Sequence, residues 1–98
     1  MAGVTHVVLV EWHQGTDRAA EVDAVVEQHL HRIDGVESVH SGPSISTEGL
    51  EAGFDWMLVV RFRDREALAD YLPHPEHQPV ADVIGGSSDR VVVFDVED

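Results

Sequence analysis

The stretch "FDWMLVVRFRDREALADYL", residues 54–72, decides the fold class because its pattern changes from that of a strand to that of a helix. Apolar side chains occupy every second position in its first half, which predicts a central strand: Phe54, Trp56, Leu58, Val60 and Phe62. Asp64 then stands where a carboxylate can accept the first free amide hydrogens of a helix. That helix is expected to end before "PHP", since proline cannot continue it.

The flanking sequence supplies the remaining elements. Thr16 or Asp17 can cap an amphipathic helix that ends near Gly35, while Gly42 and Pro43 predict a bulged or edge strand. The expected elements are strands within 4–12, 36–45 and 89–98, a helix within 16–35, another turn or two of helix within 76–84, and a flexible joint at "GGSS", residues 85–88.

This order, β-α-β-β-α-β, predicts one α+β domain over residues 1–98 with a ferredoxin-like fold. Such a fold is a four-stranded antiparallel sheet with both main helices on one face. The opposite face would then expose Val7, Leu9, Met57 and Val59. An exposed apolar sheet face of that size usually marks an interface, so we expect a homodimer in which two sheets pack face to face.

Composition excludes several classes of function. The 98 residues include 19 Asp and Glu against six Arg and no Lys, for a formal net charge of −13. Nucleic acids and anionic membranes bind through clustered cations, so neither is an expected partner. The absence of cysteine excludes disulfides and thiolate chemistry. The chain also lacks an apolar run of membrane-spanning length and the pattern of a signal peptide, so a cytoplasmic location is expected.

The candidate chemistry lies in "DYLPHPEHQP", residues 70–79. An imidazole such as that of His77 can take a proton from a carbon next to a carbonyl at neutral pH. The Tyr71 hydroxyl can donate a hydrogen bond to the oxygen that becomes an enolate, and His6 can add a third polar group. The alternative is a plain helix terminus, with Pro75 starting the next turn and His77 bonded to a backbone carbonyl.

The same segment offers a weaker metal-binding pattern. His74 and His77 lie three residues apart with Glu76 between them, which fits part of a zinc site. No third ligand follows at a suggestive spacing.

Three segments together, "VTHVVLVEW", "GFDWMLVVRFRDREALADYLPHPEH" and "VVVFDVED", resemble the stress-responsive A/B barrel (Dabb) family of dimeric α+β barrel proteins. The most specific element is Tyr71 followed by His74, Pro75, Glu76 and His77. The family includes plant stress proteins without an assigned reaction. It also includes a plant polyketide cyclase that forms olivetolic acid by aldol condensation of a poly-β-keto thioester, without a cofactor.

The resemblance implies roles for individual residues. His77 would be the base, Tyr71 would orient the substrate and His6 would line the pocket. Trp56 stands where the cyclase has another pocket histidine, and Val26 replaces a tyrosine, so the pocket here would be more apolar and its substrate need not be a polyketide. The residues expected to bind substrate are Trp56, Val26 and His74.

The resemblance also implies a site for a hard cation such as Mg²⁺. Backbone carbonyls at the end of the first helix would hold it, at Leu30, Ile33 and Val36. No other cofactor is expected.

Two functions follow as hypotheses. The first is a small cofactor-independent cyclase-like or lyase-like enzyme that uses a histidine base on a carbonyl or polyketide-type substrate. The second is a non-catalytic stress-responsive dimer that binds a small apolar ligand.

Overall fold

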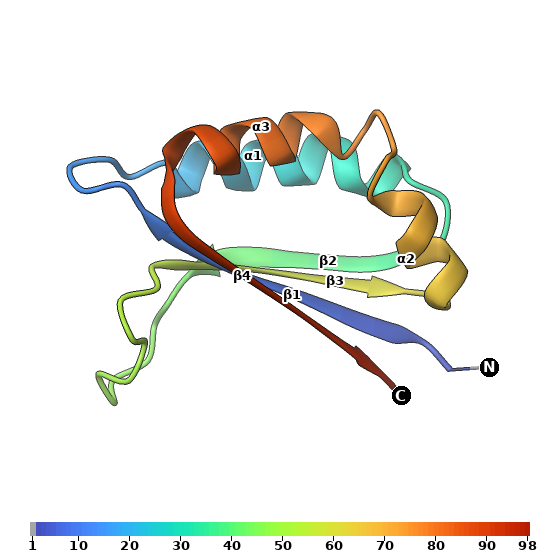
Figure 1. Cartoon of the computed structure of the whole chain (residues 1–98), viewed down its shortest axis with the longest axis horizontal. Helices are drawn as coiled ribbons and strands as arrows, with labels where there is room; N and C mark the ends of the chain where they lie inside the picture. Colours follow the sequence, from blue (N-terminus) through green and yellow to red (C-terminus); the bar gives the residue numbers. More distant parts are fainter. Residues whose placement is uncertain (1) are drawn as a thin grey trace.

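Four antiparallel strands form a sheet in the order β2-β3-β1-β4, and helices α1 and α3 lie side by side over one of its faces (Figure 1). The computed structural model describes residues 2–98. The strands are β1 (Val4–Trp12), β2 (Val36–Pro43), β3 (Trp56–Phe62) and β4 (Ser88–Glu97). The helices are α1 (Ala19–His29), the 3₁₀ turn η1 (Leu30–Arg32), α2 (Arg65–Tyr71) and α3 (Gln78–Ser87). This arrangement confirms the predicted α+β ferredoxin-like fold.

Strand β1 lies between β3 and β4, so its alternation sets which side chains face the helices. Val8 is paired with Leu58 of β3 and with Val93 of β4. The even-numbered residues of β1 are buried beneath the helices, and the odd-numbered residues are half-buried on the other face. Buried side chains from the strands and the helices form one core. Its largest fully buried side chains include Trp56, Tyr71, Phe62, Leu30 and Leu58.

The predicted start of α2 is confirmed. The Asp64 carboxylate accepts a hydrogen bond from the backbone N–H of Ala67 at 2.9 Å. At α1 the prediction holds only in part: Arg18 is the cap residue and gives no side-chain cap bond. The Asp17 carboxylate instead accepts from the backbone N–H of Ala19 at 3.1 Å, and the Thr16 hydroxyl donates to the carbonyl of His13.

Gly35 ends the helical segment as expected, at a φ of +89°. Residues with a Cβ rarely adopt this backbone conformation. A Cβ at this position would also collide with the Cβ of Ala67 on α2. Glycine therefore permits both the turn into β2 and the close approach of α2.

The expectation of a short helix followed by a flexible "GGSS" joint is wrong. Helix α3 continues through Gly85, Gly86 and Ser87, and β4 begins directly at Ser88. Tertiary contacts offset the low helix propensity of the two glycines. The carbonyl of Ser87 accepts from the backbone N–H of His13 at 2.7 Å, and its hydroxyl accepts from the Arg18 guanidinium at 3.0 Å.

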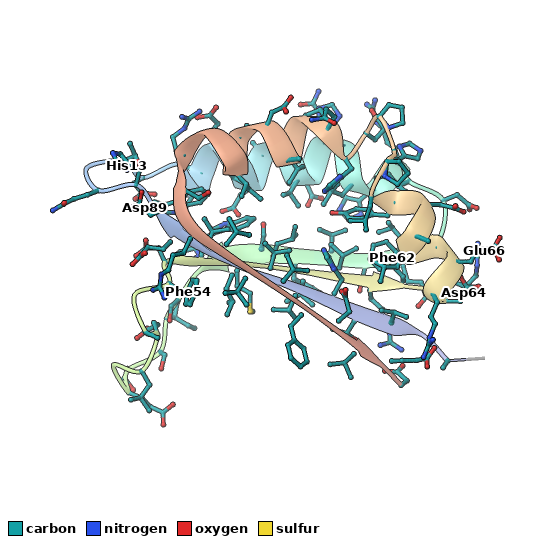
Figure 2. The ribbon with its side chains drawn as sticks, in the orientation of Figure 1. His13, Phe54, Phe62, Asp64, Glu66 and Asp89 are labelled. Carbon is teal, nitrogen blue, oxygen red and sulfur yellow. The ribbon has the colours of Figure 1, made fainter. Side chains whose placement is uncertain are left out.

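The sheet face opposite the helices carries an exposed apolar surface. Side chains extend from this face in the direction away from α1 and α3 (Figure 2). Phe94 is 65% exposed and pairs in register with Val7, while Val92 pairs with Leu9. We call this surface the apolar sheet face and define it by Val7, Leu9, Met57, Val59, Val92, Phe94 and Val96.

No helix among residues 2–98 has the length and apolar character needed to cross a membrane.

Candidate active site

Three polar side chains that are distant in the sequence meet beneath α3. His6 lies in β1 on the face covered by helices, Tyr71 is the last residue of α2, and His77 directly precedes α3. The ring centre of Tyr71 is 5.6 Å from that of His6 and 4.5 Å from that of His77. The tyrosine ring therefore contacts both imidazoles.

The three side chains line a cavity of about 240 Å³ between α3 and the sheet. Apart from backbone atoms, the rest of the cavity wall is apolar, and no Lys, Arg, Asp or Glu side chain lines it. A mostly apolar pocket with a few convergent polar groups is typical of small-molecule sites. The other lining residues are Val8, Leu58, Leu72, Val80, Ala81, Ile84, Gly85, Val91 and Val93.

His77 is held as a neutral imidazole with one free nitrogen. Its Nδ1 lies 3.0 Å from the carbonyl oxygen of Leu72. A carbonyl only accepts hydrogen bonds, so Nδ1 carries a proton, and in the neutral ring Nε2 then holds the lone pair. Burial lowers the pKa of His77, the Leu72 hydrogen bond partly opposes this, and the nearby His6 lowers it further. His77 is therefore available as a base at neutral pH.

His6 is oriented by an acidic partner that the sequence analysis missed. Its Nδ1 lies 2.5 Å from a carboxylate oxygen of Asp95 on β4. This contact occupies Nδ1 and leaves Nε2 as the ring nitrogen open to other partners. His6 and Asp95 are opposite one another in the β1–β4 register. The alternation of "VVVFDVED" would have placed Asp95 near His6 once that register was known.

Tyr71 provides an unsatisfied hydrogen-bond donor. The residue is fully buried, and its hydroxyl has no hydrogen-bond partner among the residues that the structure describes. Burial also raises the pKa of Tyr71, so the hydroxyl keeps its proton and remains a donor. Buried polar groups are normally hydrogen-bonded, so an acceptor on a ligand would supply what the fold does not.

The other residues predicted to bind substrate lie outside the lining of this cavity. Trp56 donates its indole N–H to Asp23 at 2.8 Å, and Val26 is a buried core residue of α1. His74 accepts a hydrogen bond from the backbone N–H of Glu76 at 3.0 Å. Their role in substrate binding stays a prediction.

The predicted cation site also remains a prediction. The carbonyl of Leu30 accepts from the N–H of Ile33, and the carbonyl of Ile33 accepts from the N–H of Val36, both at 3.2 Å. Each of these bonds uses one lone pair and leaves a second.

A zinc site at His74 and His77 gains no support. Within residues 2–98, no three His, Cys, Asp or Glu side chains are grouped closely enough to hold a metal ion. Glu76 instead approaches His29 at 3.2 Å and Arg32 at 3.9 Å, which ties the turn before α3 to the end of α1.

Comparison with known proteins gives matches over nearly the whole chain. The family model described as "Stress responsive A/B Barrel Domain" matches residues 4–98. The stress-response A/B barrel domain-containing protein HS1 of Arabidopsis thaliana is 30% identical over 94 residues, which cover 94% of this chain and 86% of that protein. Olivetolic acid cyclase of Cannabis sativa is 27% identical over 63 residues, which cover 64% of this chain and 62% of that enzyme.

A solved structure has closely similar architecture. It is described as a dimeric ferredoxin-like protein of unknown function from Jannaschia sp. CCS1. It is similar to this chain with a TM-score of 0.85 and 25% sequence identity, over 98% of this chain and 99% of that one.

Proposed function

Because the chain belongs to the stress-responsive A/B barrel domain family, whose members include olivetolic acid cyclase, we propose that it is a small cofactor-independent enzyme of the cyclase or lyase type. Its substrate would be a carbonyl compound with an acidic hydrogen on the neighbouring carbon. The observation that carries the proposal is the unpartnered Tyr71 hydroxyl, in contact with a neutral histidine in an apolar cavity.

The chemistry begins with proton transfer. Nε2 of His77 removes a proton from the carbon next to the carbonyl, and the electron pair of that C–H bond forms an enolate. The Tyr71 hydroxyl donates a hydrogen bond to the enolate oxygen, where negative charge develops. Nε2 of His6, oriented by Asp95, supplies a second polar contact.

Bond formation then completes a cyclisation. The enolate carbon attacks a second carbonyl of the same molecule, which forms a C–C bond and places negative charge on the second oxygen. The His77 imidazolium returns its proton to that oxygen, so the base is regenerated without an external reactant. The reverse sequence, in which a C–C bond breaks, gives the lyase reaction with the same residues.

The cavity limits the size of the substrate. Its volume of about 240 Å³ is below the range of roughly 300–1,000 Å³ that is usual for small-molecule sites. Its wall provides contacts to apolar groups from Val80, Ile84 and Val93. A compact carbonyl compound with short apolar substituents fits better than a long polyketide chain.

The second candidate is a non-catalytic dimer that binds a small apolar ligand. The hydrogen bond from His77 to the Leu72 carbonyl favours it, because the same contact is expected of a plain turn between two helices. In this case the cavity would bind ligands without turning them over.

We also propose that the protein is a homodimer formed through the apolar sheet face. The similar Jannaschia protein is described as dimeric. A hollow of about 400 Å³ adjoins this face and is lined by Leu9, Met57 and the exposed Ile45 and Leu50. On this face Arg61 and Arg90 pair with Asp98 and Glu11, so these four side chains bring no unpaired charge to the contact. Association would bury apolar area that the single chain leaves in water.

Hydrogen–deuterium exchange of a β-diketone tests the enzymatic proposal. The protein should accelerate loss of the α-proton signal of pentane-2,4-dione in D₂O, measured by NMR above the buffer rate. His77→Gln should abolish the acceleration. His31→Gln, at a partly exposed histidine outside the cavity, is the matched control and should retain it.

The result separates the two candidates. Equal exchange rates for the wild-type protein, His77→Gln and buffer would rule out the base role. Binding of the dione without acceleration would favour the ligand-binding dimer.

A further inference from the structure

We infer that this site selects uncharged carbonyl compounds and excludes their carboxylate counterparts. The inference rests on the proposed function and names its substrate class. Four features of the described residues support the inference: the cavity wall, the pairing of every arginine, the N-terminal turn of helix α3 and the net charge.

The cavity wall offers nothing to neutralise an anion. Its only ionisable side chains are His6, Tyr71 and His77. Asp95 lies 2.5 Å from Nδ1 of His6, so any positive charge on that imidazole is already offset. An anion that enters an apolar wall loses hydration that no opposite charge replaces, which is strongly unfavourable.

No side-chain cation is available nearby to compensate. The chain has no lysine, and none of its six arginines lines the cavity. Each arginine is already within ion-pair distance of a carboxylate. The pairs are Arg18–Glu21 (2.6 Å), Arg32–Glu76 (3.9 Å), Arg61–Asp98, Arg63–Asp34 (3.6 Å), Arg65–Glu97 (2.7 Å) and Arg90–Glu11 (2.9 Å).

Helix α3 begins beside the cavity, but its first turn is a poor anion site. Helix N-termini bind anions through free backbone N–H groups. Here the N–H of Gln78 already donates to the carbonyl of Pro75 at 3.3 Å, and Pro79 has no N–H. The N–H of Ala81 donates to the carbonyl of His77 at 3.1 Å. Two of these donors are therefore occupied and a third is missing, so among the described residues only the N–H of Val80 is left in this turn for an anion.

The formal net charge of −13 acts in the same direction at longer range. It repels an anion during approach, and the repulsion weakens as salt screens it. A neutral molecule meets neither barrier. Selection by charge therefore predicts a dependence on ionic strength that selection by shape would not produce.

Two nearly isosteric probes test the inference. Pentane-2,4-dione and acetoacetate share a β-dicarbonyl skeleton and differ by a methyl group in place of a carboxylate oxygen. NMR titration of the ¹⁵N-labelled protein at pH 7 should show the dione binding at least roughly tenfold tighter in about 0.1 M salt, with a smaller ratio in about 1 M salt, since the Debye length falls from about 10 Å to about 3 Å.

A variant distinguishes charge from shape. Gly85 lines the cavity from α3, and a Cβ built there has open space around it. Gly85→Lys should shift the ratio of the two affinities toward acetoacetate by about tenfold, which corresponds to about 1.4 kcal/mol. Gly85→Gln, of similar length and without charge, should leave the ratio near the wild-type value.

The outcomes separate this inference from the proposed function. If acetoacetate binds as tightly as the dione, or if Gly85→Lys leaves the ratio unchanged, selection by charge is wrong and the reaction proposed for the site still stands. If the dione does not bind at any salt concentration, both the inference and the proposed function fail.

Discussion

Replacing Tyr71 with phenylalanine should stabilise the fold and weaken the site at the same time. The side chain is fully buried and its hydroxyl is unpartnered in residues 2–98. A buried polar group without a partner costs about 1–3 kcal/mol. Phenylalanine removes that group and keeps the ring that packs on Phe62 at 4.9 Å and on His77 at 4.5 Å. The free energy of unfolding should therefore increase by about 1–3 kcal/mol.

Urea denaturation and thermal melting measure this change directly. For a domain of this size, 1 kcal/mol raises the melting temperature by roughly 4–8 °C, so a rise of at least about 4 °C is expected. The urea midpoint should increase with an unchanged slope, because the surface exposed on unfolding is nearly the same. Both proteins must be compared at one concentration, since association would shift the apparent stability.

The functional part of the same experiment measures binding of pentane-2,4-dione. Tyr71→Phe should bind the dione more weakly, because the variant lacks the hydroxyl that donates a hydrogen bond to a carbonyl oxygen. Tyr71→Ala is the control for the ring itself and should destabilise the protein by about 3–5 kcal/mol. A lower melting temperature for Tyr71→Phe would refute the reasoning, because it would show that the hydroxyl has a stabilising partner. A stabilised variant with unchanged ligand affinity would refute the role of the hydroxyl in binding.

Four further predictions follow from the structure. The pKa of His77 lies below its ordinary value of 6.5. The protein-catalysed rate of α-proton exchange in the dione should therefore be flat above pH 6.5 and fall as the pH drops through the lowered pKa. A catalysed rate that still rises above pH 8 would exclude His77 as the base. The same shift means that the folded state binds this proton less tightly than the unfolded chain. Stability should therefore fall as the pH decreases below 6.5, and His77→Gln should reduce that loss in melts at pH 5 and pH 7.5. Asp64→Ala removes the cap of α2 and should lower the free energy of unfolding by about 0.5–2 kcal/mol in urea denaturation. Asp64→Asn can still accept the cap hydrogen bond and should retain most of that stability. Equal losses in the two variants would show that charge, not capping, matters. Phe94→Asp places a charge on the apolar sheet face and should yield monomers in sedimentation velocity with the fold intact by circular dichroism, and an unchanged sedimentation coefficient would place the association elsewhere or exclude it.

The fold was predictable where local pattern and tertiary packing agree. The β-branched, apolar segment of β1, the alternation in β3 and the carboxylate at Asp64 each specify their element without help from distant residues. Helix α3 was not predictable in length, because its last turn depends on contacts between Ser87 and residues from the other end of the chain, His13 and Arg18. Glycine propensity alone favours the wrong answer there.

The candidate site was predictable as a set of residue types but not as a geometry. His6, Tyr71 and His77 were each singled out from the sequence, and the structure brings them together. Asp95 was missed because an acidic residue in an acidic chain carries no local signal. Only the pairing of β1 with β4 shows that it faces His6.

One feature of the site opposes folding, and an exposed apolar wall lies beside it. The Tyr71 hydroxyl is buried without a partner, and Val91 and Val93 of β4 leave apolar wall exposed beside it. A chain of 98 residues has a small margin of stability, so selection for folding alone favours phenylalanine at the first position and polar residues at the other two. One event would both pair the hydroxyl and cover the valines, namely the binding of a ligand with an apolar body and a single hydrogen-bond acceptor. A plain turn before α3 accounts for the hydrogen bond of His77, but it explains neither the unpaired hydroxyl nor the exposed valines.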